Sequence, residues 1–254
     1  MMIILKLINF FLEKIDYLFS PLPTVLTYHS ISDGKTTISV LTGHFRRQMA
    51  FLKESETSVI SIRDFLDFKA GKLKLKGRTI LITFDDAFRD VFLNALPILK
   101  EFNFPAVIFI NPSLLGKKAE FATREEDKKR EICSLSDLRL LAENGVAIAN
   151  HGYSHRQLSG LSESEVVAEY ENARDWIKNN FFTNSYPDVF VFPKGAKNEQ
   201  VKSYLRNNGA KILDDRIDIY SDTSPLGFIL KLSRSYFWLR KKMFLLNSFY
   251  GGVF

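Results

Sequence analysis

The sequence has almost no cysteine, no long apolar run and no secretory signal, and each of these absences argues against a class of protein. Its 254 residues include one cysteine, Cys133. No intramolecular disulfide can therefore form, and the fold does not depend on an oxidising compartment. No stretch reaches the roughly 20 consecutive apolar residues that a membrane-spanning helix needs. The N-terminus lacks the basic start and small-residue cleavage site of a secretory signal, so a cytoplasmic location is the expectation.

The charge pattern argues against nucleic-acid binding. A net charge of +6 and a pI near 9.2 would allow attraction to anionic surfaces. The basic residues are spread along the chain, however, and no Lys/Arg-rich recognition motif occurs. The densest charged run, residues 117–130, mixes both signs, and we expect it to form a solvated insertion. No nucleic-acid partner is therefore expected.

The two ends of the chain have amphipathic patterns. Residues 1–20 place apolar side chains at helical spacing, interrupted by charged residues such as Lys6 and Glu13. Residues 236–254 combine aromatic and basic side chains. Packing against the domain is the simpler interpretation of both ends, and peripheral association with the inner membrane face is the alternative. Residues 21–235, between them, are expected to form a single domain.

Strand and helix patterns alternate through this domain. Helical stripes include Phe45, Met49 and Leu52, and Ser162 with Glu165 predicts a capping box at the start of another helix. Alternation of this kind favours a parallel α/β sheet, and about eight strands favour its closure as a TIM-like barrel. Strand patterns occur at residues 24–28, 58–61, 79–84, 106–110, 146–150, 188–192, 211–214 and 229–232.

Polar groups follow directly on several of the predicted strands. They are His29, the pair Asp85 and Asp86, His151, and the pair Asp214 and Asp215. In a parallel barrel the carboxyl ends of the strands share one rim, so residues far apart in sequence can meet there. The sequence therefore predicts an active site at this rim.

Three of these side chains form a plausible metal-ligand set. Asp86, His151 and His155 would supply one carboxylate oxygen and two imidazole nitrogens and leave coordination positions open for water and substrate. Asp85 could then accept a proton from the attacking water. Taken alone, an Asp-Asp pair is usually a turn or cap, and two histidines at this spacing are often surface residues. Their joint position after two apolar strands favours a metal-dependent hydrolase.

These segments resemble a known family. Residues 83–86 (TFDD) and 151–155 (HGYSH) are similar to the first two motifs of the polysaccharide deacetylases, also called NodB-homology proteins or family 4 carbohydrate esterases. The resemblance extends over most of residues 24–215, including Tyr28-His29 and the segment 190–195 (FVFPKG). It implies a distorted (β/α)7 TIM-like barrel that removes acetyl groups from sugars with Zn²⁺ or a related ion such as Co²⁺, Ni²⁺ or Mn²⁺.

The resemblance also implies roles for individual residues. Asp85 would be the general base, and Asp86, His151 and His155 the metal ligands. The backbone N–H of Lys194 would help to hold the oxyanion.

A proton donor for the leaving amine is the remaining role. No histidine follows His155, and in the branch that resembles poly-N-acetylglucosamine deacetylases the opening Tyr-His histidine takes this role. His29 is therefore the expected general acid, although a structural hydrogen-bonding role is the simpler interpretation of a histidine at a strand end. The substrate would be an N-acetylated sugar of a polysaccharide or of a lipid-linked glycan.

Departures from the family pattern leave alternatives open. Lys194 replaces an aromatic residue, no arginine-containing third motif is visible, and the acidic-aromatic fourth motif is missing unless Asp214 or Asp215 substitutes for it. A strand-end turn is the preferred interpretation of that pair. A catalytically weakened, carbohydrate-binding relative is therefore the second hypothesis. A non-haem iron oxygenase could use the same ligand types, but its carboxylate usually follows the first histidine.

Overall fold

The computed structural model describes residues 23–34, 36–195, 198–214, 216–220 and 228. The amphipathic ends predicted at residues 1–20 and 236–254 lie outside the described residues, as does the strand predicted at residues 229–232. Within the described residues, no helix is both long enough and apolar enough to cross a membrane.

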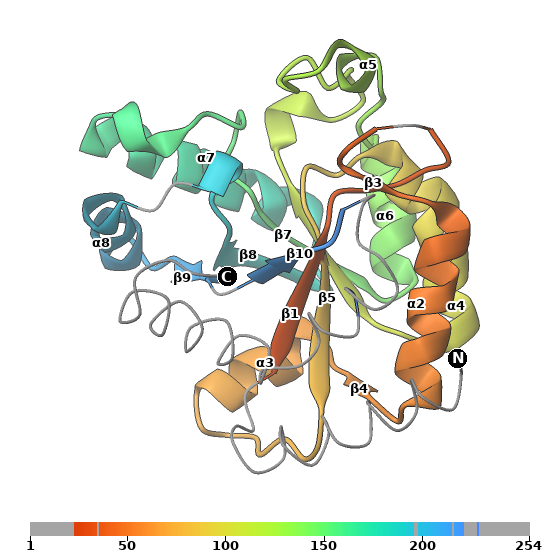
Figure 1. Ribbon diagram of the computed structural model, residues 1–254. Coiled ribbons are helices and arrows are strands. Elements are labelled where there is room, and N and C mark those ends of the chain that lie inside the picture. The colour runs from red at the N-terminus through yellow and green to blue at the C-terminus, as the bar shows by residue number, and fades with distance from the viewer. Residues whose placement is uncertain (1–22, 35, 196–197, 215, 221–227, 229–254) are drawn as a thin grey trace, which may run out of the picture.

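A parallel sheet forms the centre of the structure (Figure 1). Its strands are ordered β10-β1-β5-β6-β7-β8-β9, and β4 pairs with β5 beside this path. Among the described residues no ladder joins the edge strands β9 and β10, so the barrel is open on that side. The predicted distorted α/β barrel is confirmed. The strands are β1 (Thr24–Tyr28), β4 (Ser58–Val59), β5 (Thr79–Phe84), β6 (Ala106–Ile110), β7 (Val146–Asn150), β8 (Ser185–Phe190), β9 (Lys211–Ile212) and β10 (Arg216–Asp218).

Helices cover the sheet on two flanks. In Figure 1, α2, α4 and α6 lie to the right of the sheet, α7 and α8 lie to the left, and α5 projects at the top. A short two-stranded sheet, β2 (Ser30–Ile31) with β3 (Ser39–Val40), follows β1. The helices are α2 (Thr42–Glu54), α3 (Ile62–Lys69), the π-helix η1 (Val91–Ala95), α4 (Leu96–Phe102), α5 (Glu125–Lys128), α6 (Leu135–Glu143), α7 (Glu163–Asn180) and α8 (Glu199–Asn207).

The strands are apolar because both of their faces are buried. Even-numbered side chains such as Leu26 and Ile82 pack with the helices on one side. Odd-numbered side chains such as Leu81 and Val107 form a second cluster with Phe65 of α3 on the other side. Alternating side chains point to opposite faces of a strand, so a doubly covered sheet requires apolar residues at successive positions.

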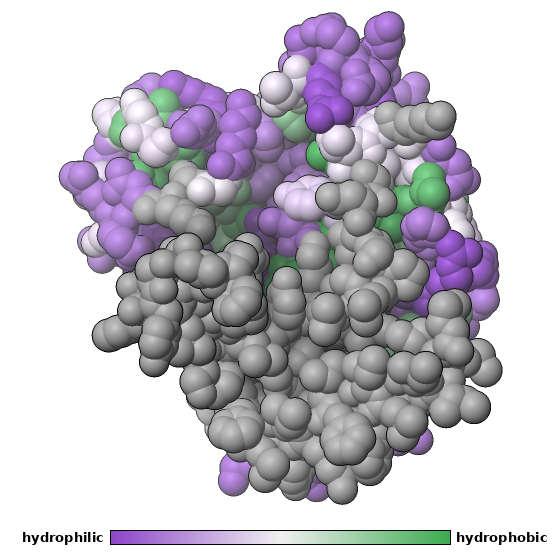
Figure 2. All heavy atoms as spheres, in the orientation of Figure 1, coloured by the Kyte–Doolittle hydropathy of each residue, from purple (hydrophilic) through white to green (hydrophobic). Residues whose placement is uncertain are grey.

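Local signals determine where the helices begin. The capping box predicted at Ser162 and Glu165 is present at α7, and equivalent boxes begin α3 at Ser61 and α6 at Ser134. The three predicted side chains Phe45, Met49 and Leu52 are buried along α2. Figure 2 shows a mostly hydrophilic surface over the upper helices, as expected for the solvated faces of amphipathic helices.

Some predicted strand bounds are wrong for identifiable reasons. The strand predicted at 58–61 ends at Val59 because Ser61 caps α3. The strand predicted at 188–192 spans Ser185–Phe190 instead, and its early part contains Pro187, which disfavours a strand prediction. The strand predicted at 211–214 spans Lys211–Ile212. Strand β10 was not predicted. It pairs with β1, although the two strands lie near opposite ends of the domain's sequence.

Candidate metal centre and active site

Three of the predicted ligands converge above the carboxyl ends of β5 and β7. The Oδ1 atom of Asp86 lies 3.2 Å from Nε2 of His151 and 3.0 Å from Nε2 of His155. With metal–ligand bonds of about 2.0–2.1 Å, a tetrahedral site places neighbouring ligand atoms about 3.3 Å apart. Among the described residues, this is the one group of three or more His, Cys, Asp or Glu side chains close enough to share an ion.

The hydrogen bonds around this cluster fit a cation between the three side chains. Nδ1 of His151 lies 3.0 Å from the carbonyl oxygen of Val191, so this nitrogen carries the proton and Nε2 of a neutral ring presents a lone pair to Asp86. The buried Oδ1 of Asp86 has no hydrogen-bond partner within the described residues. Facing lone pairs repel unless a proton or a metal ion lies between them, so the donor set suits a divalent metal ion.

The charges in the cluster are strongly coupled. Burial opposes ionisation of Asp86, but the two neighbouring imidazoles hold the pKa of this carboxyl well below its usual range. Burial would lower the pKa of His151, yet the neighbouring carboxylates of Asp86 and Asp85 raise it. Burial lowers the pKa of His155. A buried cluster of one carboxylate and two imidazoles favours binding of a cation, either a proton or a metal ion.

The second carboxylate, Asp85, forms an ion pair with an arginine. Nη1 of Arg216 donates to both carboxylate oxygens of Asp85, at 2.8 and 2.7 Å. Both side chains are largely buried, with exposed fractions of 4% for Asp85 and 16% for Arg216. Sequence reasoning missed Arg216, and the available signal was an arginine directly after the last acidic pair. Asp85 is therefore paired with Arg216 and is not a member of the Asp-His-His cluster.

His29 lies on the same rim as Asp85. Strands β1 and β5 are paired with Tyr28 opposite Phe84, so His29 and Asp85 are the first residues beyond two neighbouring strands. The His29 ring stacks on Tyr220, with centroids 6.0 Å apart. Its buried Nδ1 has no hydrogen-bond partner in the described part of the chain. The simpler interpretation of His29, a structural hydrogen-bonding role, therefore finds no support at Nδ1.

Lys194 lies in a tight turn next to the histidine segment. The turn is the short helix η4 (Pro193–Gly195), in which Lys194 has a left-handed φ of 54° and an exposed side chain. A side-chain carbon at Gly152, in the histidine segment, would lie 3.5 Å from Pro193.

The charged run at residues 117–130 has mostly exposed charged side chains, as expected of a solvated insertion, but it also contacts the site. The Phe121 ring packs against the His155 ring with centroids 4.2 Å apart. Arg130 forms ion pairs with Asp90 and with Asp127, whose side chain is buried. The guanidinium also donates to hydroxyl groups of β2 and β3. The insertion is therefore attached to the rim and forms one wall of the site.

The acidic pair after β9 does not join the cluster. Asp214 forms an ion pair with Lys202 of α8 at 3.2 Å and is 40% exposed. Asp215 lies outside the described residues. Asp214 therefore lies at the surface beyond β9, and the strand-end turn preferred for this pair stays a prediction.

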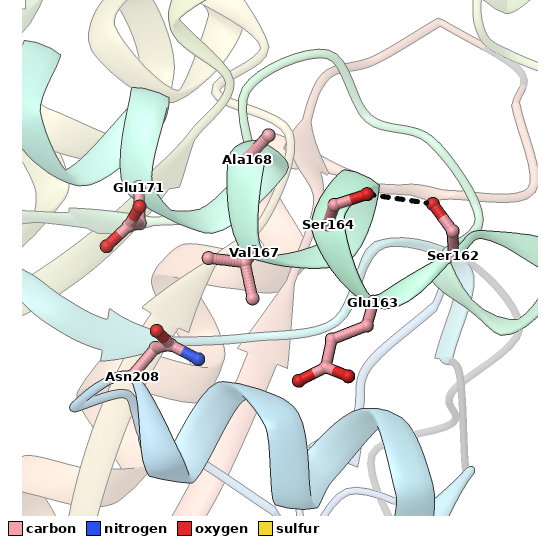
Figure 3. Close-up of a pocket in the computed structure, with 7 residues that line it drawn as sticks. All are labelled: Ser162, Glu163, Ser164, Val167, Ala168, Glu171 and Asn208. Carbon is pink, nitrogen blue, oxygen red and sulfur yellow. Dashed lines mark hydrogen bonds between the residues drawn. The ribbon is translucent and has the colours of Figure 1, made fainter.

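An open groove between α7 and α8 lies apart from the metal cluster (Figure 3). It has a volume of about 640 Å³, and none of the predicted site residues lines it. Its lining residues are Ser162, Glu163, Ser164, Val167, Ala168, Glu171 and Asn208. No member of the Asp-His-His cluster reaches this groove, so the chemistry of the molecule is expected at the strand-end rim instead.

Known proteins are similar in sequence to this chain. YxkH of Bacillus subtilis is 25% identical over 185 residues, which is 73% of this chain and 61% of YxkH. The poly-β-1,6-N-acetyl-D-glucosamine N-deacetylase of Staphylococcus aureus is 24% identical over 204 residues, 79% of this chain and 66% of the relative. This chain therefore spans about three fifths to two thirds of the length of these curated relatives.

Solved structures agree in fold. The deacetylase PplD of Streptococcus pyogenes, in complex with acetate, superimposes with a TM-score of 0.69 at 18% identity, covering 84% of this chain and 99% of PplD. IcaB of Ammonifex degensii has a TM-score of 0.67 at 20% identity, covering 81% of this chain and 89% of IcaB. The family model described as polysaccharide deacetylase matches residues 72–213, more than half of the chain. With its parallel sheet and Asp-His-His cluster, the chain belongs to the polysaccharide deacetylase family.

Proposed function

We propose that the protein is a metal-dependent hydrolase that removes acetyl groups from N-acetylated sugars of a polysaccharide or a lipid-linked glycan. The observation that carries this proposal is the pairing of two acids with different environments. Asp86 lies in the cluster with two imidazoles, whereas Asp85 is bound by Arg216 outside it. Metal-assisted hydrolysis needs one carboxylate as a ligand and another as a proton acceptor.

Zn²⁺ is the proposed ion, held by Asp86, His151 and His155. Two imidazoles and one carboxylate suit zinc, and three protein ligands leave a position open, as in catalytic zinc sites. Co²⁺, Ni²⁺ and Mn²⁺ accept the same donor types. When bound, the ion would polarise the acetyl carbonyl and lower the pKa of bound water.

The side chains of this protein provide the proton transfers. Asp85 accepts the proton of the attacking water, and Arg216 keeps both carboxylate oxygens in a fixed orientation. The N–H of Lys194 donates to the oxyanion of the tetrahedral intermediate. His29 gives a proton to the departing amine, which lets the carbon–nitrogen bond break. The free amine and acetate are the products.

Two features of similar proteins support the substrate class. The Staphylococcus aureus relative is named for a poly-N-acetylglucosamine substrate, and PplD was solved with acetate, the product of deacetylation. An N-acetylglucosamine polymer is therefore the first substrate to test. The binding-only alternative requires that a catalytic group be absent or displaced from the rim.

Acetate release tests this proposal. Zinc-loaded protein is expected to release acetate from N-acetylglucosamine oligomers, and the Asp85→Asn variant is expected to lose about 10²–10⁴-fold in kcat, the usual contribution of a general base. Asp214→Asn is the matched control, because it removes an acid at another strand end that is paired with Lys202. Glycan binding without acetate release would favour the carbohydrate-binding alternative.

The location of the enzyme is part of the proposal. A cytoplasmic protein bound peripherally at the inner membrane face would meet lipid-linked glycans, and the amphipathic pattern of residues 1–20 supports this arrangement. Deletion of residues 1–20 is expected to reduce co-sedimentation with anionic liposomes. Unchanged co-sedimentation would contradict a membrane role for this segment.

A further inference from the structure

The segment that carries both metal-binding histidines has an unusual backbone. Between His151 and His155 the chain makes a tight turn in which Gly152 has a φ of 80° and His155 a φ of 60°. Left-handed φ values are costly for a residue with a side chain, so His155 keeps this conformation only if its surroundings enforce it. The direction of the His155 ring therefore depends on groups outside the segment.

A buried carboxylate on α7 provides part of this support. Glu169 Oε2 accepts hydrogen bonds from the backbone N–H of Tyr153 at 3.0 Å and of Ser154 at 2.9 Å. Glu169 Oε1 accepts a hydrogen bond from the Ser154 hydroxyl. The Glu169 side chain is only 7% exposed. The two N–H groups that precede His155 thus point at one fixed carboxylate.

Asparagines and backbone groups satisfy the rest of the segment. Asn111 donates to the carbonyl oxygens of His151 at 2.6 Å and of Gly152 at 3.0 Å. Asn150 accepts from the Gly152 N–H at 2.8 Å. The carbonyl oxygen of Tyr153 accepts from the backbone N–H of Ser113 at 3.1 Å. Glu169 is the only charged member of this set.

Among the described residues, no cationic side chain balances the carboxylate of Glu169. Within the described residues, no Lys, Arg or His forms an ion pair with Glu169, whereas Asp85 is paired with Arg216. Asp86 and Glu169 then contribute two negative charges around the histidine segment. A buried carboxylate without a cation is costly, and a divalent ion in the cluster would offset that cost.

We propose that Glu169 is a positioning residue that orients the His151–His155 segment and raises the affinity of the Asp-His-His cluster for its divalent ion. This inference rests on the metal site of the proposed function. Groups that orient metal ligands typically contribute about 10–100-fold to metal affinity. Glu169 acts through the backbone of the segment and does not contact the substrate.

Two substitutions separate the hydrogen bonds of Glu169 from its charge. In Glu169→Gln the amide oxygen can accept both backbone N–H groups while the amide nitrogen donates to Ser154 Oγ, so only the charge is lost. Glu169→Leu removes charge and hydrogen bonds at similar volume. Glu171→Gln is the matched control. Glu171 is on the same helix, lines the open groove between α7 and α8 in Figure 3 and pairs with the partly exposed Arg174.

The measurement is the zinc dissociation constant of the whole chain, determined by competition with a chromophoric chelator. Glu169→Leu is expected to weaken zinc binding about 10–100-fold, Glu169→Gln about threefold to tenfold, and Glu171→Gln less than twofold. Hydrogen exchange at Tyr153 and Ser154 is expected to become faster in Glu169→Leu and to change little in Glu169→Gln. A purely structural role would lower the thermal stability of metal-free and zinc-loaded protein equally and leave zinc affinity unchanged.

Zinc affinity within twofold of the wild type in both folded variants would overturn the proposal. If Glu169→Leu does not fold, Glu169→Gln alone decides by the same criterion. Failure of the proposed function looks different, since wild-type protein would then bind no stoichiometric zinc or release no acetate. A wild type that binds zinc and releases acetate, with variants of unchanged affinity, would remove only the role of Glu169.

Discussion

The ion pair between Asp85 and Arg216 allows a quantitative test of how the site is built. Replacing Arg216 with Met removes a guanidinium that contacts both oxygens of Asp85 and leaves a carboxylate with 4% exposure unpaired. Loss of one partner from a buried pair typically costs about 3–5 kcal/mol. Since Arg216 is 16% exposed, we expect the lower end, about 3 kcal/mol, in the free energy of unfolding of metal-free protein.

A double-mutant cycle isolates the contribution of this pair. In an Asp85→Asn background no buried charge is left behind, so Arg216→Met is expected to cost only about 1 kcal/mol, which implies a coupling energy of about 2 kcal/mol. Urea unfolding of the four proteins measures these values. Arg174→Met is the control, because Arg174 has a similar exposure of 20% but pairs with the more exposed Glu171 and Asp175. Its cost is expected to stay near or below about 1 kcal/mol.

The same substitution should change catalysis in a particular way. Arg216 orients Asp85, so Arg216→Met is expected to lower kcat for acetate release about 10–100-fold, with KM changed by less than about threefold. A coupling energy below about 0.5 kcal/mol, or a loss confined to KM, would refute the view that Arg216 holds the proton acceptor in place.

Two substitutions and one thiol-labelling experiment test the wall of the site and the core beneath it. Arg130→Gln leaves the carboxylates of Asp90 and Asp127 without their guanidinium, so urea unfolding should show a loss of about 2–4 kcal/mol, and a loss under about 1 kcal/mol would mean that the insertion is not anchored there. Phe121→Ala removes the ring that covers one metal-site imidazole, and zinc release to a chelator should become faster; an unchanged rate would contradict the packing role. Burial raises the pKa of the Cys133 thiol well above its usual value, so little thiolate forms at pH 8 and native protein should react with a disulfide reagent only when urea unfolds it. Rapid reaction of the native protein would show that this part of the core opens.

Much of the fold could be predicted because the signals are local. Strands buried on both faces need successive apolar residues, and β1, β5, β6 and β7 were predicted with their observed bounds. The capping box at Ser162 is likewise contained within a few residues. Strand β8 was misjudged because Pro187 opposes a strand assignment, and only pairing with β7 compensates for it.

The metal cluster was predictable for a topological reason. Asp86 and His151 each lie just beyond a buried parallel strand, and parallel strands end at a common rim. Glu169 and Arg130 could not be identified in this way. Glu169 belongs to an amphipathic helix rich in acids, and Arg130 belongs to a mixed charged run, so each resembles a solvated surface residue in sequence.

The amino-acid sequence by itself therefore determined the parallel α/β framework and the three cluster residues, because strand burial, helix caps and strand ends depend on near neighbours along the chain. Only the tertiary structure decided which distant groups support that cluster. The contact of Arg216 with Asp85 depends on β10 pairing with β1, and that of Glu169 with the histidine segment depends on how α7 packs. Pairings of this kind are set by the packing of the whole domain, which no short segment of sequence encodes.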